Sequence, residues 1–193
     1  MRILAGEFKG RTLLAPARGS PARPITGHVK KSLFGMLAPV LDGATVLDLY
    51  CGTGTLGLEA LSQGAGRCCF ADRDRAAIAR LRRNIEMVAA ADRCEVRCGE
   101  VESHLERWLD ELGWRVDVAF VDPPYAQTRR WSWAEAADKI FAPLGRRLAE
   151  GGVVVLRMSG PEAPPQRVGP LVVRRIRRYG EMVLALMGKA GPA

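Results

Sequence analysis

The sequence lacks any long hydrophobic run. None of the apolar stretches in its 193 residues approaches the roughly 20 residues that a membrane-spanning helix needs. The first six residues, MRILAG, also lack the apolar core of an export signal. We therefore expect a protein without a membrane segment that works in the cytoplasm, and we expect it to be a monomer.

Metal ligands are equally scarce. The two histidines, His28 and His104, stand alone, and the five cysteines form neither a CxxC pair nor a cluster with histidine. An odd number of cysteines in a chain without an export signal is typical of reduced thiols. We therefore expect neither a metal site nor disulfide bonds.

Acidic residues are nearly absent from both ends of the chain. Residues 1–31 contain seven Lys or Arg and one Glu, and residues 167–193 contain six and one, whereas the whole chain carries a net charge of +8. The middle is therefore slightly acidic. Two basic ends around such a body are typical of a protein that holds nucleic acid. The alternative is a basic surface that only aids solubility.

From residue 45 onward, strand and helix patterns alternate. Strands are predicted over residues 45–50, 67–71, 93–98, 115–121 and 152–158, and helices over 55–63, 74–90, 101–112 and 134–149. Such repeated units predict a mostly parallel, doubly wound α/β sheet that binds its ligands at the carboxyl ends of the strands. Residues 171–178 and 181–187 predict an antiparallel hairpin at the C-terminus.

A small basic appendage precedes this sheet. Residues 2–5 and 11–14 predict a hairpin, the Pro-rich residues 16–24 a connector, and residues 28–37 an amphipathic helix. We therefore divide the chain into an appendage, residues 1–40, and a catalytic domain, residues 41–193.

The turn after the first strand of the sheet has the pattern of a nucleotide-cofactor site. Gly52 and Gly54 permit backbone angles closed to other residues, and the next helix offers free N–H groups. With Asp72 lying 20 residues beyond Gly52, the spacing also fits an NAD-type dinucleotide-binding oxidoreductase, which is the alternative. Asp48 favours a site for S-adenosylmethionine over a dinucleotide site. Its carboxylate would repel a pyrophosphate but suits the sulfonium and ammonium groups of S-adenosylmethionine.

Further residues complete the predicted cofactor site. Asp72 can accept hydrogen bonds from ribose hydroxyls, and Glu100 either reaches the adenine amino group or stabilises the first turn of its helix. The predicted cofactor-binding residues are Asp48, Tyr50, Gly52, Gly54, Asp72, Glu100 and Val101.

The strongest signal is the tetrapeptide Asp122-Pro123-Pro124-Tyr125, which follows the apolar strand 115–121. Two prolines stiffen the backbone and remove two donors, leaving the Asp122 carboxylate and the Pro123 carbonyl as acceptors. These can hold the N–H groups of an exocyclic base amine and aim its lone pair at a methyl donor. Tyr125 would stack on a base that has left its own stack. A plain Pro-Pro turn is the alternative.

Nearly the whole chain resembles the bacterial 16S rRNA guanine-N2 methyltransferases of the RsmD type, which are class I enzymes with a Rossmann-like fold. The resemblance rests on motifs that occur in order and spacing: residues 1–6, 9–11, 23–26, 29–34, 47–61, 70–75, 121–125 and 179–181. It implies that Asp122 and Tyr125 are catalytic and that S-adenosylmethionine is the methyl donor. It also implies that N2 of a guanine in 16S rRNA is the acceptor, within the 30S subunit or its assembly intermediate.

We predict RNA contacts at Arg2, Lys9, Arg11, Arg23 and Thr26. The chain departs from the family's usual residues at Gly27, His28 and Lys31, where substrate contacts are expected, so which guanine is modified stays open. A DNA adenine or cytosine amino-methyltransferase would use the same tetrapeptide and is a second alternative.

Overall fold

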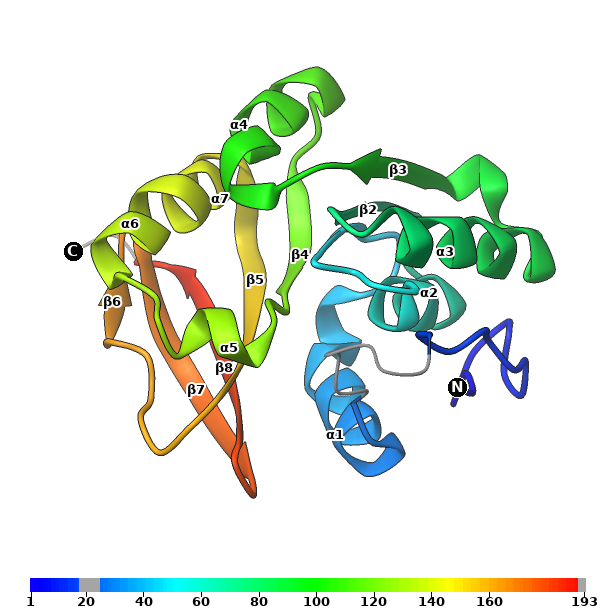
Figure 1. The fold of residues 1–193 in the computed structure, drawn as a ribbon, viewed down its shortest axis with the longest axis horizontal. Helices are drawn as coiled ribbons and strands as arrows, with labels where there is room; N and C mark the ends of the chain where they lie inside the picture. The colour runs from blue at the N-terminus through cyan, green and yellow to red at the C-terminus, as the bar shows by residue number, and fades with distance from the viewer. Residues whose placement is uncertain (18–24, 191–193) are drawn as a thin grey trace.

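The computed structural model of the protein describes residues 1–17 and 25–190, and within them one eight-stranded sheet has helices on both faces (Figure 1). The strand order is β3-β2-β1-β4-β5-β8-β7-β6. The first five are parallel, and β8, β7 and β6 are antiparallel additions. The chain therefore reverses its direction of winding between β1 and β4, where open α/β sheets bind ligands. In the described residues, no helix combines the length and apolar character needed to cross a membrane.

The predicted alternation of strands and helices is confirmed, with most bounds within a residue or two. The strands are β1 (Thr45–Leu49), β2 (Arg67–Asp72), β3 (Cys94–Cys98), β4 (Val116–Val121), β5 (Leu148–Ser159), β6 (Arg167–Val168), β7 (Leu171–Tyr179) and β8 (Met182–Lys189). The helices are α1 (Gly27–Leu37), α2 (Thr55–Ser62), α3 (Arg75–Met87), α4 (Val101–Leu112), α5 (Tyr125–Thr128), α6 (Trp133–Ala136) and α7 (Ala142–Arg147). Two short 3-10 turns, Ala38–Val40 and Ala91–Arg93, and a π-helical segment, Ala137–Phe141, complete the elements.

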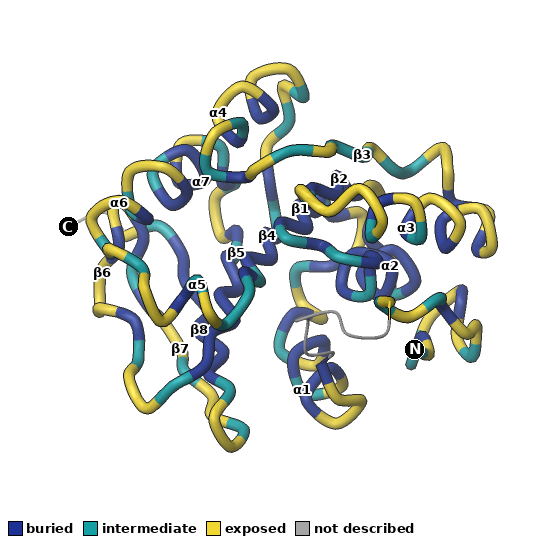
Figure 2. The backbone as a smooth tube through the Cα atoms, in the orientation of Figure 1, coloured by how far each residue is buried: buried dark blue, intermediate teal, exposed yellow. Residues whose placement is uncertain are grey.

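Alternate residues of the strands fill two separate hydrophobic layers. Val46, Phe70 and Phe120 pack on the face covered by α1, α2 and α3, whereas their neighbours Leu47 and Ala119 pack under α4 and α7. Successive strand side chains point to opposite faces, so a fully covered sheet needs apolar residues at nearly every strand position. Figure 2 shows this continuous buried centre, with exposed residues on the outer helix faces.

Two elements differ from the sequence prediction. The N-terminal hairpin contains a single bridge, between Arg2 and Thr12, in place of two short strands. The helix predicted over 134–149 is divided into α6, a π-helical segment and α7. It ends at Arg147, because the next residue, Leu148, already belongs to β5. Pro143, in the first turn of α7, has no N–H, so the regular hydrogen-bond pattern is interrupted at this point.

The N-terminal segment packs tightly against the sheet domain. Ser62 accepts a hydrogen bond from the Phe8 N–H at 2.9 Å, and Gly6 lies so close that a Cβ there would be 1.6 Å from the Ser62 carbonyl oxygen. Asn84 on α3 accepts from the Leu14 N–H at 2.7 Å. Ile3, Phe8 and Leu13 belong to the same hydrophobic layer as α1–α3. The proposed division at residue 40 therefore crosses a continuous core.

The C-terminal hairpin reaches back to α1. At its tip, the Tyr179 hydroxyl donates a hydrogen bond to the Ser32 hydroxyl at 2.6 Å, and the Tyr179 ring lies edge-on to His28. Figure 1 shows the hairpin tip and α1 on the same side of the molecule. The basic hairpin and the N-terminal helix thus meet, although more than 140 residues separate them in sequence.

Candidate functional site

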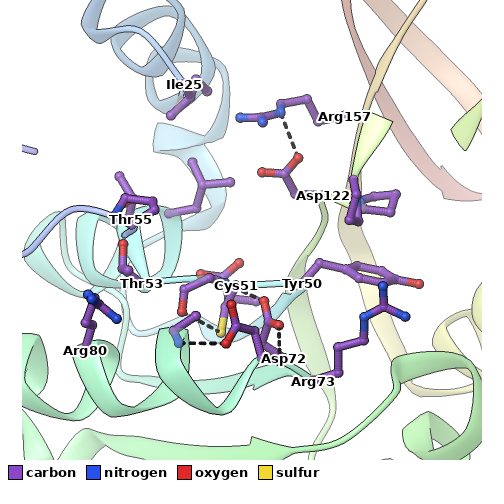
Figure 3. A pocket seen from close by; sticks show the side chains of 18 of the residues that line it. Ile25, Tyr50, Cys51, Thr53, Thr55, Asp72, Arg73, Arg80, Asp122 and Arg157 are labelled. Atoms are coloured by element: carbon purple, nitrogen blue, oxygen red, sulfur yellow. Dashed lines mark hydrogen bonds and ion pairs between the residues drawn. The ribbon is translucent and has the colours of Figure 1, made fainter. Parts of the chain in front are cut away.

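A cavity of about 300 Å³ opens at the carboxyl ends of β1, β2 and β4. Its walls come from the turn after β1, the end of β2, the start of α3 and the tetrapeptide after β4; Met1 and Ile25 of the N-terminal segment also contribute (Figure 3). Of the predicted residues, it brings together Asp48, Tyr50, Gly52, Asp72, Asp122, Pro123 and Tyr125. The cavity is therefore the candidate active site.

The turn after β1 is shaped by backbone angles that few residues adopt. Gly52 has φ +55° and open space where a side chain would stand, so a ligand can approach its backbone. Gly54 has φ +81°, and a Cβ there would lie 2.3 Å from the Leu81 side chain, so this glycine permits the turn to pack on α3. Tyr50, with φ +58°, is strained. Its hydroxyl donates to Glu102 at 2.6 Å.

Asp48 is buried below this turn and lines the cavity. Its carboxylate accepts the Gly57 N–H at 2.8 Å, which ties β1 to the first turn of α2. Burial raises the pKa of Asp48 to about 8, and the nearby Asp122 and Asp72 add to the rise, while the Gly57 hydrogen bond and Arg157 oppose it. A buried carboxyl in this state gains most from a cationic ligand.

Asp72 organises the opposite side of the turn. One carboxylate oxygen accepts the Gly52 N–H at 2.7 Å, and the other accepts the Asp74 N–H at 2.8 Å. Asp74 itself caps α3 by accepting from the N–H groups of Ala76 and Ala77. Asp72 thus holds the glycine turn while its remaining acceptor positions are available to hydroxyl donors in the cavity.

Asp122 faces Arg157, which was not among the predicted site residues. Arg157 Nε on β5 lies 2.7 Å from Asp122 Oδ1, and the two side chains point toward one another at the cavity wall (Figure 3). The Arg157 guanidinium also lies over the Tyr125 ring, 5.5 Å from its centroid. Burial raises the pKa of Asp122 to about 6, with Arg157 opposing the rise and Asp72 adding to it.

The two prolines present different carbonyls. The Pro124 carbonyl accepts the N–H groups of Gln127 and Thr128 and so begins α5. Within residues 1–17 and 25–190, no hydrogen bond is directed at the Pro123 carbonyl, while Pro123 lines the cavity. The rigid backbone therefore leaves one carbonyl acceptor beside the Asp122 carboxylate.

Three predicted cofactor residues do not line the cavity. Gly54 packs behind the turn, and Val101 is buried under α4 in the hydrophobic core. Glu100 is exposed and pairs with Arg73 at 3.3 Å, so it borders the cavity only through that arginine.

The predicted RNA contacts lie outside the cavity as well. Arg2, Lys9 and Arg11 are exposed on the N-terminal segment. Thr26 is the N-cap of α1, where it accepts from the Val29 N–H. Arg23 lies outside the described residues. Their contact with RNA stays a prediction.

Arg73, Arg80 and Arg157 line the cavity without having been predicted. Arg157 had a signal in the sequence, because it is the one charge inside the apolar run 153–158 of β5. Charged residues are almost never fully buried unless they are paired, so a charge in a central strand indicates a buried partner. The partner itself could not be read from the sequence.

The donors and acceptors fit S-adenosylmethionine. The cavity has the volume of a small-molecule site, with carboxylates for the cationic groups and a glycine turn that a ligand can approach closely. No group of three or more metal-ligating side chains occurs among the residues that the structure describes. A doubly wound sheet with this site at its switch point defines a class I S-adenosylmethionine-dependent methyltransferase, as predicted.

Comparison with known proteins places the chain within a family. The model of the family described as "Conserved hypothetical protein 95" matches residues 1–188, and the chain belongs to this family. Together with the relatives named below, this match confirms the resemblance to methyltransferases of the RsmD type.

Two relatives and one solved structure illustrate the match. "Putative rRNA methyltransferase YlbH" of Bacillus subtilis is 35% identical over 192 residues, which is 99% of this chain and 100% of that protein. "Ribosomal RNA small subunit methyltransferase D" of Escherichia coli is 37% identical over 126 residues, 65% of this chain and 60% of that protein. The structure of "Putative methyltransferase yhhF from Escherichia coli" superposes with a TM-score of 0.79 at 28% identity, covering 98% and 97% of the two chains. These similarities favour the methyltransferase over the oxidoreductase alternative.

Proposed function

We propose that this protein transfers a methyl group from S-adenosylmethionine to the exocyclic N2 amine of a guanine in 16S rRNA. The observation that carries the proposal is the Asp122 carboxylate on the cavity wall beside Pro123 and Tyr125. The names of the two relatives support an rRNA substrate. The 30S subunit or its assembly intermediate is the proposed partner, and the cytoplasmic and monomeric states stay predictions.

The chemistry follows from the weakness of the nucleophile. The lone pair of an exocyclic base amine is delocalised into the ring, so the amine attacks poorly unless its N–H groups are held out of plane. The Asp122 carboxylate and the Pro123 carbonyl supply two acceptors for these N–H groups, and the prolines fix their positions. Attack makes the nitrogen acidic, and Asp122 takes the proton or passes it to water. Tyr125 stacks on the extruded base.

The remaining acidic residues hold the methyl donor. S-adenosylmethionine, when bound, supplies a methyl group activated by a positively charged sulfur. The Asp48 carboxylate would stabilise a cationic group of the donor, and Asp72 would accept hydrogen bonds from its ribose hydroxyls. The open backbone at Gly52 permits close approach of the donor. Asp48 and Gly52 belong to β1 and the turn after it, and Asp72 ends the neighbouring strand β2, so the donor would be held at the carboxyl ends of two adjacent strands.

A basic strand beside the cavity supports an RNA substrate. Arg175, Arg177 and Arg178 are exposed on β7. Arg177 pairs with Leu184 of β8, and Leu184 pairs with Arg157 of β5, so these three side chains lie in a row on one face of the sheet. Two strand spacings, roughly 10 Å, separate β7 from β5. Phosphates bound along β7 would therefore bring a nucleotide near Asp122.

The test is transfer of a labelled methyl group to naked 16S rRNA, isolated 30S subunits and duplex DNA, followed by mass spectrometry of the nucleosides. We expect N2-methylguanosine in the rRNA. Methylated adenine or cytosine in DNA would instead establish the amino-methyltransferase alternative. No transfer to any of the three, with tight cofactor binding, would contradict the proposed substrate.

A further inference from the structure

Arg157 is an unusual residue for its position. It occupies a strand between two others, in a run of apolar residues, and only 7% of it is exposed. Burying a guanidinium costs several kcal/mol unless charge and hydrogen bonds offset the loss of hydration. Leu156 and Met158 beside it show that an apolar residue suits this strand. The fold alone therefore does not require an arginine here.

Two contacts of Arg157 are made with the tetrapeptide. Its Nε lies 2.7 Å from Asp122 Oδ1, and its guanidinium carbon lies 5.5 Å from the centre of the Tyr125 ring. Through this contact the guanidinium attracts one oxygen of the carboxylate and so favours one orientation of the Asp122 side chain. One side chain thus touches both residues that are assigned to the target base.

The charges around Asp122 make this contact important. Asp48 at the end of β1 and Asp72 at the end of β2 face the same cavity, so three carboxyls lie around one small space. Arg157 from β5 is the cation that opposes the raised pKa of Asp122, which burial brings to about 6. Without this guanidinium, burial and the Asp72 carboxylate would favour the protonated acid, which has lost acceptor capacity for an amine.

We propose that Arg157 is a positioning residue for methyl transfer: it keeps the Asp122 carboxylate ionised and fixed in orientation, and it steadies the Tyr125 ring. This inference rests on the proposed function, because it takes Asp122 as the acceptor of the substrate amine. It adds a cation that lets the buried Asp122 carboxylate accept hydrogen bonds from the substrate amine near neutral pH.

The first test compares Arg157→Met and Arg157→Lys across pH 5.5 to 9. Arg157→Met should lower kcat about tenfold or more at pH 7 and move the acid limb of the kcat profile upward by about one unit, with activity partly restored at high pH. Arg157→Lys retains a charge without the planar fork, so it should leave the acid limb near its original position while lowering kcat. The cofactor Kd, measured at pH 9 where the Asp48 carboxyl is mostly ionised, should change little in both. Arg115→Met, which removes an exposed arginine outside the cavity, is the matched control.

A double-mutant cycle tests whether Arg157 acts through Asp122. In an Asp122→Asn background, Arg157→Met should cause at most about a twofold further loss of kcat, because the carboxylate it serves is already gone. Equal fold losses in both backgrounds would overturn the proposal. So would a uniform fall in kcat for Arg157→Met with an unchanged pH profile, because that result is expected of a purely structural residue.

A direct titration keeps the test independent of turnover. The carboxyl carbon of Asp122, assigned by comparison with Asp122→Asn, can be followed by NMR as the pH is raised. We expect its midpoint to rise by about one unit in Arg157→Met, or in Arg157→Gln if the Met variant does not fold. An unchanged midpoint would overturn the proposed role. The two failures can be distinguished. If the wild-type enzyme methylates none of the nucleic acids but the Asp122 midpoint still shifts in the Arg157 variant, the proposed function is wrong and the effect of Arg157 on Asp122 stands.

Discussion

Lys30 Nζ lies 2.5 Å from Glu59 Oε2, and both side chains are buried, with exposed fractions of 3% and 0%. Lys30 also donates to the Arg2 carbonyl at 2.8 Å, while Glu59 accepts the N–H groups of Leu4 and Ala5. The pair therefore joins α1, α2 and the N-terminal segment. A lysine that the charge distribution assigns to a basic end is in fact a structural residue, and it holds the segment whose Met1 lines the cavity.

Lys30→Met should destabilise the protein by about 3–5 kcal/mol, because it leaves the Glu59 carboxylate buried without a counter-charge. The measurement is denaturant unfolding monitored by circular dichroism. Lys31→Met, at the exposed neighbouring position, should change the free energy of unfolding by no more than about 0.5 kcal/mol. Similar effects of the two substitutions would contradict a structural role for the pair.

Asp122→Ala should lower kcat by about 10²- to 10⁴-fold while the affinity for S-adenosylmethionine changes only a few-fold. The reason is that Asp122 holds the substrate amine, whereas Asp48 and Asp72 hold the methyl donor. Methyl transfer and isothermal titration calorimetry on the same preparation measure both quantities. Parallel losses of kcat and cofactor affinity would show that the role assigned to Asp122 is wrong.

Cofactor binding should strengthen as the pH rises from 6 to 8. The pKa of Asp48 is about 8 in the free protein because its carboxyl is buried, so below that pH the group holds a proton. A cationic ligand favours the carboxylate, and binding must then release this proton; the affinity is therefore lowest at acid pH. Calorimetry in buffers of different ionisation enthalpy measures the proton release.

Asp48→Asn is the matched control for this pH dependence, because its amide oxygen can still accept the Gly57 N–H. The variant should bind the cofactor more weakly above pH 8 and with little dependence on pH. A wild-type affinity that does not vary between pH 6 and 8 would count against a titrating carboxyl beside the ligand.

Replacing Arg175, Arg177 and Arg178 together with glutamine should weaken RNA binding and reduce the slope of log K against log salt by about 2 to 3. The expected cause is the loss of up to three phosphate contacts along β7, of which Arg175 and Arg177 lie on the face of Arg157 and Arg178 on the opposite face. Arg82, Arg83 and Arg115, which are exposed elsewhere, give a control variant with the same loss of charge. Equal weakening in both variants would indicate that net charge, rather than a β7 surface, governs binding.

The same measurement on Arg2→Gln, Lys9→Gln and Arg11→Gln tests the N-terminal contacts predicted from the sequence. We expect a smaller change in slope than for β7, because Arg2 already donates to the Gly10 carbonyl, whereas Arg177 of β7 lies in one row with the cavity residue Arg157. A larger change would indicate that the main RNA-binding surface is the N-terminal segment and not β7.

The sequence alone determined the order of elements, the class of fold and the main site motifs. Strands such as Val116–Val121 and the turn at Gly52 are encoded by neighbouring residues, through apolar patterning and permitted backbone angles. The tetrapeptide at Asp122 is likewise a continuous segment, so its chemistry could be recognised without a structure.

Only the tertiary structure decided which charged residues meet. Arg157 and Asp122 lie on different strands, and Lys30 and Glu59 lie on different helices, so each pairing depends on how the elements pack. The same holds for the exclusion of Val101 from the cavity and for the contact of Tyr179 with Ser32. Side-chain patterns specify the elements locally, whereas the burial and pairing of a charge depend on neighbours brought together from distant parts of the chain.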